Sequence, residues 1–132
     1  MNPKNRKSEA DYDDLATTYQ VVQIALLNSI LKSNGIADKR KRRKICEDYL
    51  FSEGVILDEG AFQTKQRGKW YAPVPAFAHA PGNPDDGFRR ARKLQTLTND
   101  FAGFHEYALG NVSYFFDDCK ETTPFDWGPE YE

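Results

Sequence analysis

The residues of this sequence best suited to chemistry form an unbroken run of cations. The run consists of Lys39, Arg40, Lys41, Arg42, Arg43 and Lys44. Six consecutive residues of a helix point around its whole circumference, so they cannot all lie on one solvated side. Cations near a helix start also oppose the helix dipole, which costs about 0.3–1 kcal/mol for each exposed cation. Because such local conflicts concentrate at functional sites, the run predicts a surface that binds a polyanion or an acidic protein surface.

A second group of cations occurs later in the chain and consists of Arg89, Arg90, Arg92 and Lys93. We expect this group to begin a helix, so that two basic helix starts converge on the phosphates of a nucleic acid. A different interpretation of the first run is a solvated patch that the chain's own acidic residues neutralise. The pI of about 5.7 and the lack of an RRM, KH, zinc-finger or helix-turn-helix signature restrict nucleic-acid binding to such a local surface.

The end of the chain, residues 117–132, is acidic and aromatic. It contains Phe125, Trp127 and Tyr131, and rings of this kind are typical anchors of protein interfaces. The segment therefore predicts an alternative function, in which an accessory or inhibitor protein docks on a basic or nucleic-acid-binding protein partner. Packing of the same rings on the protein's own core is the competing interpretation. An electrostatic latch between this end and the basic run fits both.

No pattern in the sequence predicts catalysis, and a small enzyme is only the third interpretation. Cys46 is expected on a buried helix face, and His105 lies one step from an apolar seam, so neither is an activated nucleophile or base. Asp85 and Asp86 near His79 lack the spacing of a calcium loop. We therefore predict a non-enzymatic protein with no catalytic residues, no metal and no cofactor.

Hydrophobic periodicity predicts the helices that position the cations. The first helix spans Asp11 to Lys32, with a stop at Asn34-Gly35, and its apolar stripe is Leu15, Tyr19, Val22, Leu26 and Ile30. The second begins at the cap Asp38 and stops at Gly54, with the stripe Ile45, Cys46, Tyr49 and Leu50. The third begins at Asn83 or Asp86 and ends near Gly110, with the seam Ala91, Leu94, Leu97, Phe101, Phe104 and Ala108.

Short strands are expected between and after these helices. Residues 61–65 and 69–71 flank a turn that contains Gly68 and predict a β-hairpin. Trp70 and Tyr71 are expected to form its core, with base stacking on these rings as the alternative. Residues 112–116 predict another strand. The fold class is therefore α+β, with three amphipathic helices packed with a small antiparallel hairpin and short edge strands.

The chain of 132 residues fits a single domain over 1–132, with a flexible arm at 1–10 and the acidic aromatic tail at 117–132. The third helix's seam permits a monomer or a dimer. Residues 1–14 have no apolar signal-peptide region, no segment is apolar enough to cross a membrane, and the two cysteines suit a reducing compartment. We therefore expect a cytoplasmic protein with no membrane partner.

Overall fold

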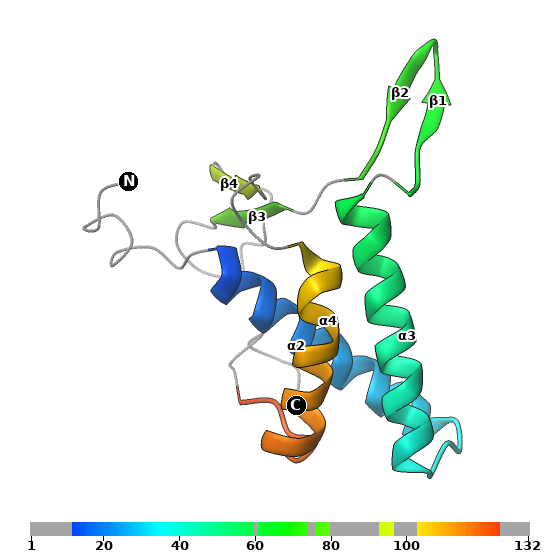
Figure 1. Ribbon diagram of the computed structural model, residues 1–132, viewed down its shortest axis with the longest axis vertical. Helices are drawn as coiled ribbons and strands as arrows, with labels where there is room; N and C mark the ends of the chain where they lie inside the picture. Colours follow the sequence, from blue (N-terminus) through cyan, green and yellow to red (C-terminus); the bar gives the residue numbers. More distant parts are fainter. Residues whose placement is uncertain (1–11, 60, 74–75, 80–92, 97–102, 125–132) are drawn as a thin grey trace, which may run out of the picture.

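The computed structural model describes residues 12–59, 61–73, 76–79, 93–96 and 103–124. Its main helices are α2 (Tyr12–Ser33), α3 (Lys39–Asp58) and α4 (Phe104–Ser113), which pack side by side (Figure 1). Two small antiparallel sheets accompany them, β1 (Thr64–Gln66) with β2 (Lys69–Tyr71), and β3 (Ala76–His79) with β4 (Lys93–Thr96). The predicted α+β class is confirmed. The predicted arm at 1–10 lies outside the described residues.

Helix α2 ends where the sequence predicts. Its last turn closes with a hydrogen bond of 3.0 Å from the Ile36 N–H to the Leu31 carbonyl. Gly35 within this turn has a φ of 86°, a left-handed conformation that favours glycine. The Asn34-Gly35 stop is therefore a local property of the chain, independent of packing.

The buried face of α2 differs from the predicted stripe. Tyr19, Leu26 and Ile30 of that stripe are exposed, and the fully buried positions are Ala16, Gln20, Val21, Ile24 and Asn28. The polar members of this face have partners on other elements. The Gln20 amide donates to the Phe104 carbonyl at 2.9 Å and accepts from Asn111 at 2.8 Å. Apolar periodicity selects the wrong face because buried amides are stable once such partners are supplied.

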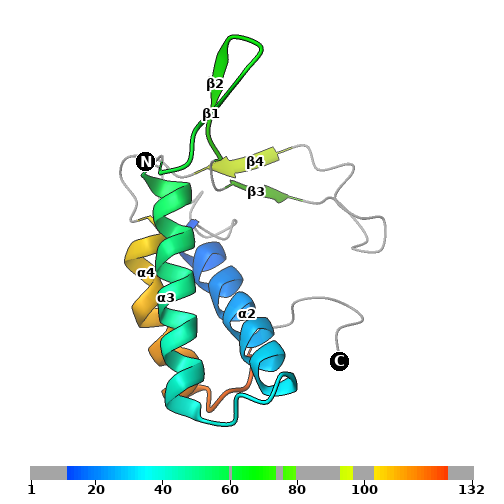
Figure 2. The ribbon, with the colours of Figure 1, turned by 90° about the vertical axis from the view of Figure 1, so that its right-hand side faces the viewer.

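Helix α3 begins at the predicted cap, where the Asp38 carboxylate accepts from the Arg40 N–H at 3.0 Å. It continues past the predicted stop at Gly54 and ends at Asp58. Gly54 is buried against α4, and a Cβ at this position would lie 2.4 Å from the backbone nitrogen of His105. This glycine therefore permits the close approach of α3 and α4 that Figure 2 shows, and it does not end the helix.

The prediction of one long third helix is wrong. Residues 93–96 form strand β4, which pairs with β3 in the register Phe77 with Gln95 and Ala78 with Leu94. Helix α4 begins only at Phe104, and the expected dimerisation seam along one helix is broken, because Leu94 belongs to a strand. The seam residues Ala91, Leu97 and Phe101 lie outside the described residues. The helical spacing of apolar residues could not predict this strand, because strand formation at 93–96 depends on pairing with β3, which is distant in the sequence.

The predicted strand at 112–116 is also wrong, because the chain remains helical there. Helix α4 passes into a π-helical turn, η3 (Tyr114–Asp118), closed by a hydrogen bond from the Cys119 N–H to the Tyr114 carbonyl. Phe115 and Phe116 are both buried and form an edge-to-face ring pair with centroids 5.2 Å apart. The wider turn lets two adjacent rings enter one core.

The main core lies between the three helices. Its fully buried residues are Val21, Ile24, Cys46, Leu50, Ala108, Val112, Phe115 and Phe116. Strand β3 joins a smaller cluster, in which Phe77 meets the ring of Phe104 at a centroid distance of 6.2 Å. The β1–β2 hairpin belongs to neither cluster and projects away from the helices (Figures 1 and 2).

The contact at Gly54 gives a prediction with opposite signs at two glycines. Gly54→Ala should lower the free energy of unfolding by about 1–3 kcal/mol, because the methyl group forces α3 away from the α4 backbone. Gly110→Ala should raise it by about 0.5–1 kcal/mol, because nothing lies within 4 Å of that Cβ and alanine favours a helix. Denaturant unfolding of both variants checks this, and equal effects would contradict the close helix approach.

Candidate polyanion interface

Arg42 is a structural residue, contrary to its predicted role in binding. It is buried within the run, and its Nε donates to Asn28 Oδ1 at 2.8 Å. Its Nη1 donates to the carbonyls of Ile36 and Ala37 at 3.1 and 2.6 Å, and its Nη2 donates to Glu121 Oε1 at 2.9 Å. The guanidinium thereby joins α2, the α2–α3 loop and the segment after η3, and it is not accessible to a ligand.

The turn that carries Glu121 is held in an unusual conformation. Lys120 and Glu121 have φ values of 51° and 64°, which non-glycine residues rarely adopt. Burial alone would raise the pKa of the Glu121 carboxyl, but hydrogen bonds from Arg42 and Asn28 and the charge of Lys32 lower it overall. The buried ion pair therefore supports a turn that is locally unfavourable, and this turn directs Lys120 outward.

Two further cations of the run have acidic partners within the protein. The Nη1 atom of Arg43 lies 2.8 Å from Asp117 Oδ1, and the Nζ atom of Lys44 lies 2.8 Å from Asp48 Oδ1. Two residues of the acidic end contact the basic run, Asp117 through Arg43 and Glu121 through Arg42, which is the part of the expected latch that falls within the described residues. These residues therefore contribute less to an external field than the sequence suggests.

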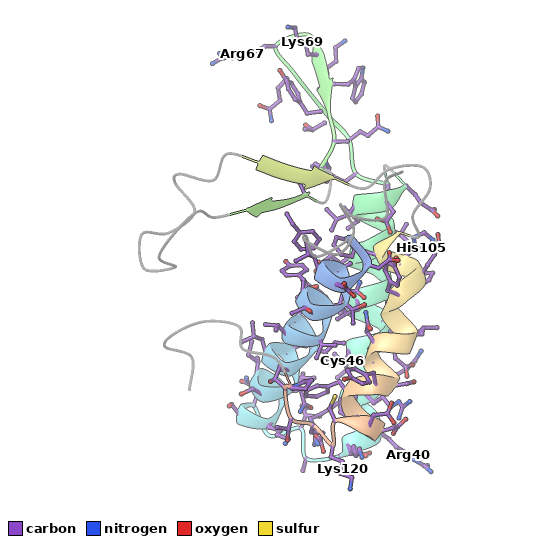
Figure 3. The ribbon with its side chains drawn as sticks, turned by 90° about the vertical axis from the view of Figure 1, so that its left-hand side faces the viewer. Arg40, Cys46, Arg67, Lys69, His105 and Lys120 are labelled. Carbon is purple, nitrogen blue, oxygen red and sulfur yellow. The ribbon has the colours of Figure 1, made fainter. Side chains whose placement is uncertain are left out.

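Four further cations at this end of the helices are exposed, and we call them the basic end: Lys39, Arg40, Lys41 and Lys120. All four side chains are exposed, and among the described residues none has an acidic partner in an ion pair. Figure 3 shows Arg40 and Lys120 projecting from the same end of the helices. The basic end therefore combines the start of α3 with the turn after η3, two segments that are far apart in the sequence.

The described member of the second predicted cation group, Lys93, does not join the basic end. Lys93 begins strand β4, which lies at the opposite end of α3 from the run (Figure 1). The predicted convergence of two basic helix starts is therefore wrong for this residue. The other members, Arg89, Arg90 and Arg92, lie outside the described residues, as do the docking candidates Phe125, Trp127 and Tyr131. Docking through the acidic aromatic end remains a prediction.

The β1–β2 hairpin is exposed, which contradicts the predicted burial of its rings and leaves base stacking on them as the remaining interpretation. Trp70 and Tyr71, predicted to be its core, are 65% and 54% exposed. Arg67 and Lys69 project from its tip (Figure 3). The register of β1 and β2 explains why the two rings are exposed. Lys65 lies opposite Trp70, so the hairpin has no apolar face to bury. The sequence signal for this exposure is the group of three cations, Lys65, Arg67 and Lys69, that directly precedes the two rings.

The thiol and imidazole examined for catalysis do not meet. Figure 3 shows Cys46 and His105 at different levels of the bundle. Burial raises the pKa of the Cys46 thiol to about 11, so this cysteine is held as an unreactive thiol at neutral pH. The expected burial of Cys46 is confirmed.

His105 is part of a junction between the end of α3 and the start of α4. Asp58 Oδ2 accepts from the His105 backbone N–H at 2.8 Å and lies 2.8 Å from its Nδ1. Asp58 thereby caps α4 from another helix, and a Cβ on the cap residue Gly103 would lie 2.4 Å from that same oxygen. The Asp58 side chain is only 4% exposed, and its buried Oδ1 has no hydrogen-bond partner among the described residues.

The carboxylates around His105 set its protonation. Its Nε2 lies 3.2 Å from Glu59 Oε1 and 4.0 Å from Glu106 Oε1. The hydrogen bond to Asp58 raises the pKa of the imidazole, burial opposes this, and the charges of Glu59, Asp58 and Glu106 add to the rise. His105 therefore acts as a cationic link between α3 and α4 at mildly acid pH.

Two further observations bear on ligand class. Within the parts of the chain that the structure describes, no group of three or more His, Cys, Asp or Glu residues is arranged to hold a metal ion. None of the described helices combines the length and the apolar character that a membrane span requires.

The buried role of Arg42 predicts a large difference between neighbouring cations. Arg42→Met should lower the free energy of unfolding by about 1–3 kcal/mol, because the buried Asn28 oxygen and the Ile36 and Ala37 carbonyls lose their donor. Glu121 loses its closest cation but keeps Asn28 and Lys32 as partners. Arg40→Met should change it by less than about 0.5 kcal/mol, because this side chain is exposed. Urea unfolding at pH 7 compares the two, and an equal small effect would refute the network.

The raised pKa of His105 predicts a pH dependence of stability. A raised folded-state pKa contributes stability that is complete below the unfolded value, 6.5, and is lost as pH rises through the folded value. The free energy of unfolding should therefore fall more steeply above pH 6.5 in the natural protein than in His105→Gln. Unfolding curves from pH 5.5 to 9 test this, and parallel profiles would contradict the His105–Asp58 link.

Comparison with known proteins adds no relative from which a role could be transferred. No protein-family model matches the chain, and neither the curated proteins nor the solved structures contain a significant match. The functional argument therefore rests on the geometry of the basic end, the hairpin and the helix junction.

Proposed function

We propose that this chain is a non-enzymatic binding or regulatory protein that engages a polyanion, specifically a nucleic acid, through the basic end. One observation carries the proposal. Internal partners engage Arg42, Arg43 and Lys44, whereas Lys39, Arg40 and Lys41 remain exposed at the same end of the helices as Lys120. The three exposed cations of the run therefore stay accessible to an external anion.

The fold supports this role by holding the charges in place. The Asp38 cap and the Arg42 network fix the first turn of α3, so its side chains extend from a rigid backbone. The Asp38 carboxylate already meets the positive end of the helix dipole, so the attraction for phosphate comes from the exposed side chains. Because the net charge of the chain is −2, the attraction must be local, and it should be sensitive to salt.

Nucleic acid is favoured over an acidic protein surface by charge density. Duplex DNA carries about one negative charge per 1.7 Å of helix axis, and each neutralised phosphate releases counterions. Clustered Lys and Arg side chains bind such a ligand as fixed charges, without a chemical step. An acidic protein partner would present sparser charge to the same surface, and the test below separates the two.

Charge reversal at the basic end tests this function. Lys39→Glu, Arg40→Glu and Lys41→Glu together should abolish binding to DNA or RNA oligonucleotides at low salt. The free energy of unfolding should hold or rise slightly, because anions suit the start of a helix. The control Lys39→Arg with Lys41→Arg keeps every charge and should bind like the natural protein. Fluorescence anisotropy against salt concentration measures these affinities.

The outcomes separate the interpretations. Natural-protein binding that weakens steeply with salt and disappears in the charge-reversed variant supports the proposal. Equal binding by both proteins, or binding by neither across duplex DNA, single-stranded DNA and RNA, identifies the basic end as a solvated patch. If the natural protein binds an acidic protein but no oligonucleotide, and the charge-reversed variant loses that binding, the surface belongs to a protein partner. This outcome overturns the nucleic-acid proposal.

A further inference from the structure

The β1–β2 hairpin turns through two residues with left-handed backbones. Arg67 and Gly68 have φ values of 50° and 80°, which is the pattern of a type I′ turn. The turn fixes the register of the strands, with Thr64 opposite Tyr71, Lys65 opposite Trp70 and Gln66 opposite Lys69. The positions of the rings and cations therefore follow directly from the turn.

Alternation along the strands divides these side chains between two faces. One face holds Trp70 with Lys65 directly opposite it, and directly opposite residues have Cβ atoms about 4.5–5.5 Å apart. The other face holds Tyr71 and Lys69 on one strand, opposite Thr64 and Gln66 on its partner. Each face thus combines one aromatic ring with one ammonium group, and Arg67 adds a cation at the tip.

The surroundings of the hairpin leave both faces accessible. Trp70 and Tyr71 are largely exposed, and neither belongs to a core cluster of the described residues. Residues 61–73 contain three cations and no acidic residue. Figures 1 and 2 show the hairpin extending from the end of α3 away from the helices. The hairpin is therefore complementary to an anion that also offers flat apolar surfaces.

We propose that this hairpin binds single-stranded nucleic acid, with unpaired bases stacked on Trp70 and Tyr71 and with phosphates near Lys65, Arg67 and Lys69. Base stacking on aromatic rings combined with cations that follow the backbone is the general mode of single-strand recognition. A duplex hides the faces of its bases and exposes only their edges. Large rings on both faces of a ribbon therefore match unpaired bases better than they match a groove.

Arg67 supports a binding role for the tip. The left-handed conformation at this position is unfavourable for arginine and common for asparagine or glycine. Arginine therefore lowers hairpin stability and places a cation at the most exposed point of the turn. A residue that opposes local stability in this manner is typical of a functional site.

The hairpin site is separate from the basic end. The two surfaces lie at opposite ends of α3, whose 20 residues span about 30 Å. The inference rests on the hairpin alone, so it stands or falls independently of the function proposed for the basic end. The experiments below use variants of both surfaces so that the two failures are distinguishable.

Ring truncation is the primary test. Trp70→Ala and Tyr71→Ala in the full chain should each weaken binding of a 15-residue oligodeoxythymidylate by roughly 5- to 150-fold, the range expected for one stacked base. Tyr49→Ala is the matched control, because Tyr49 is 53% exposed and Tyr71 54%, but Tyr49 lies on α3. Trp70→Phe keeps a ring and should restore most of the affinity.

Two spectroscopic and thermodynamic readouts accompany the affinities. Stacking should quench tryptophan emission in the natural protein when the oligonucleotide is added, and this change should disappear in Trp70→Phe, which leaves Trp127 as the remaining tryptophan. Arg67→Asn should raise or maintain thermal stability, because asparagine tolerates the turn. The same variant should reduce the slope of log affinity against log salt by about 0.7, the value for one phosphate contact on a single strand.

Each outcome is decisive. Weaker single-strand binding in the ring variants, with the Tyr49 control unchanged and a matched duplex bound less tightly, supports the hairpin site. Binding lost only in the charge-reversed basic end, with the ring variants unaffected, overturns the hairpin proposal and leaves the proposed function standing. Stronger binding to the duplex overturns the single-strand assignment. Quenching by phosphatidylserine-containing vesicles but not by the oligonucleotide also overturns it and indicates a lipid surface.

Discussion

The pairing of the Arg42 guanidinium controls how one end of this molecule is built. A buried cation is tolerated only when its donors meet acceptors, and here the acceptors come from α2, from the loop before α3 and from the turn after η3. The network therefore sets the positions of three chain segments together. This arrangement holds the start of α3 in place and leaves the cations of the basic end exposed. Arg42, the buried member of the run, therefore positions the exposed ones.

A different constraint, close backbone approach, organises the other end. Gly54 lets α3 pass against the start of α4, and Gly103 leaves room for the Asp58 carboxylate to cap that helix. The same carboxylate orients His105. Backbone contact, helix capping and a titratable link thus meet at one junction, which is why small side chains are required at two positions there.

These two constraints leave the molecule with separate cationic surfaces at opposite ends of α3 (Figure 1). The positive electrostatic field of the basic end comes from exposed side chains at the start of α3 and in the turn after η3. The hairpin combines cations with rings on a ribbon outside the core. Charge alone favours any polyanion at the first surface, whereas exposed rings add a preference for unpaired bases at the second. The two proposals therefore predict different dependences on salt and on ligand structure.

Local chemistry determined much of this protein by sequence alone. The Asp38 cap, the Gly35 stop, the α+β class and a turn at Gly68 all follow from neighbouring residues. Tertiary structure decided which cations are free, because the Glu121 partner of Arg42 lies 79 residues away. It also decided the buried face of α2, the strand at 93–96 and the exposure of Trp70. Each of these three features depends on whether another segment, distant in sequence, packs or pairs with it. Periodicity within one segment carries no information about such partners.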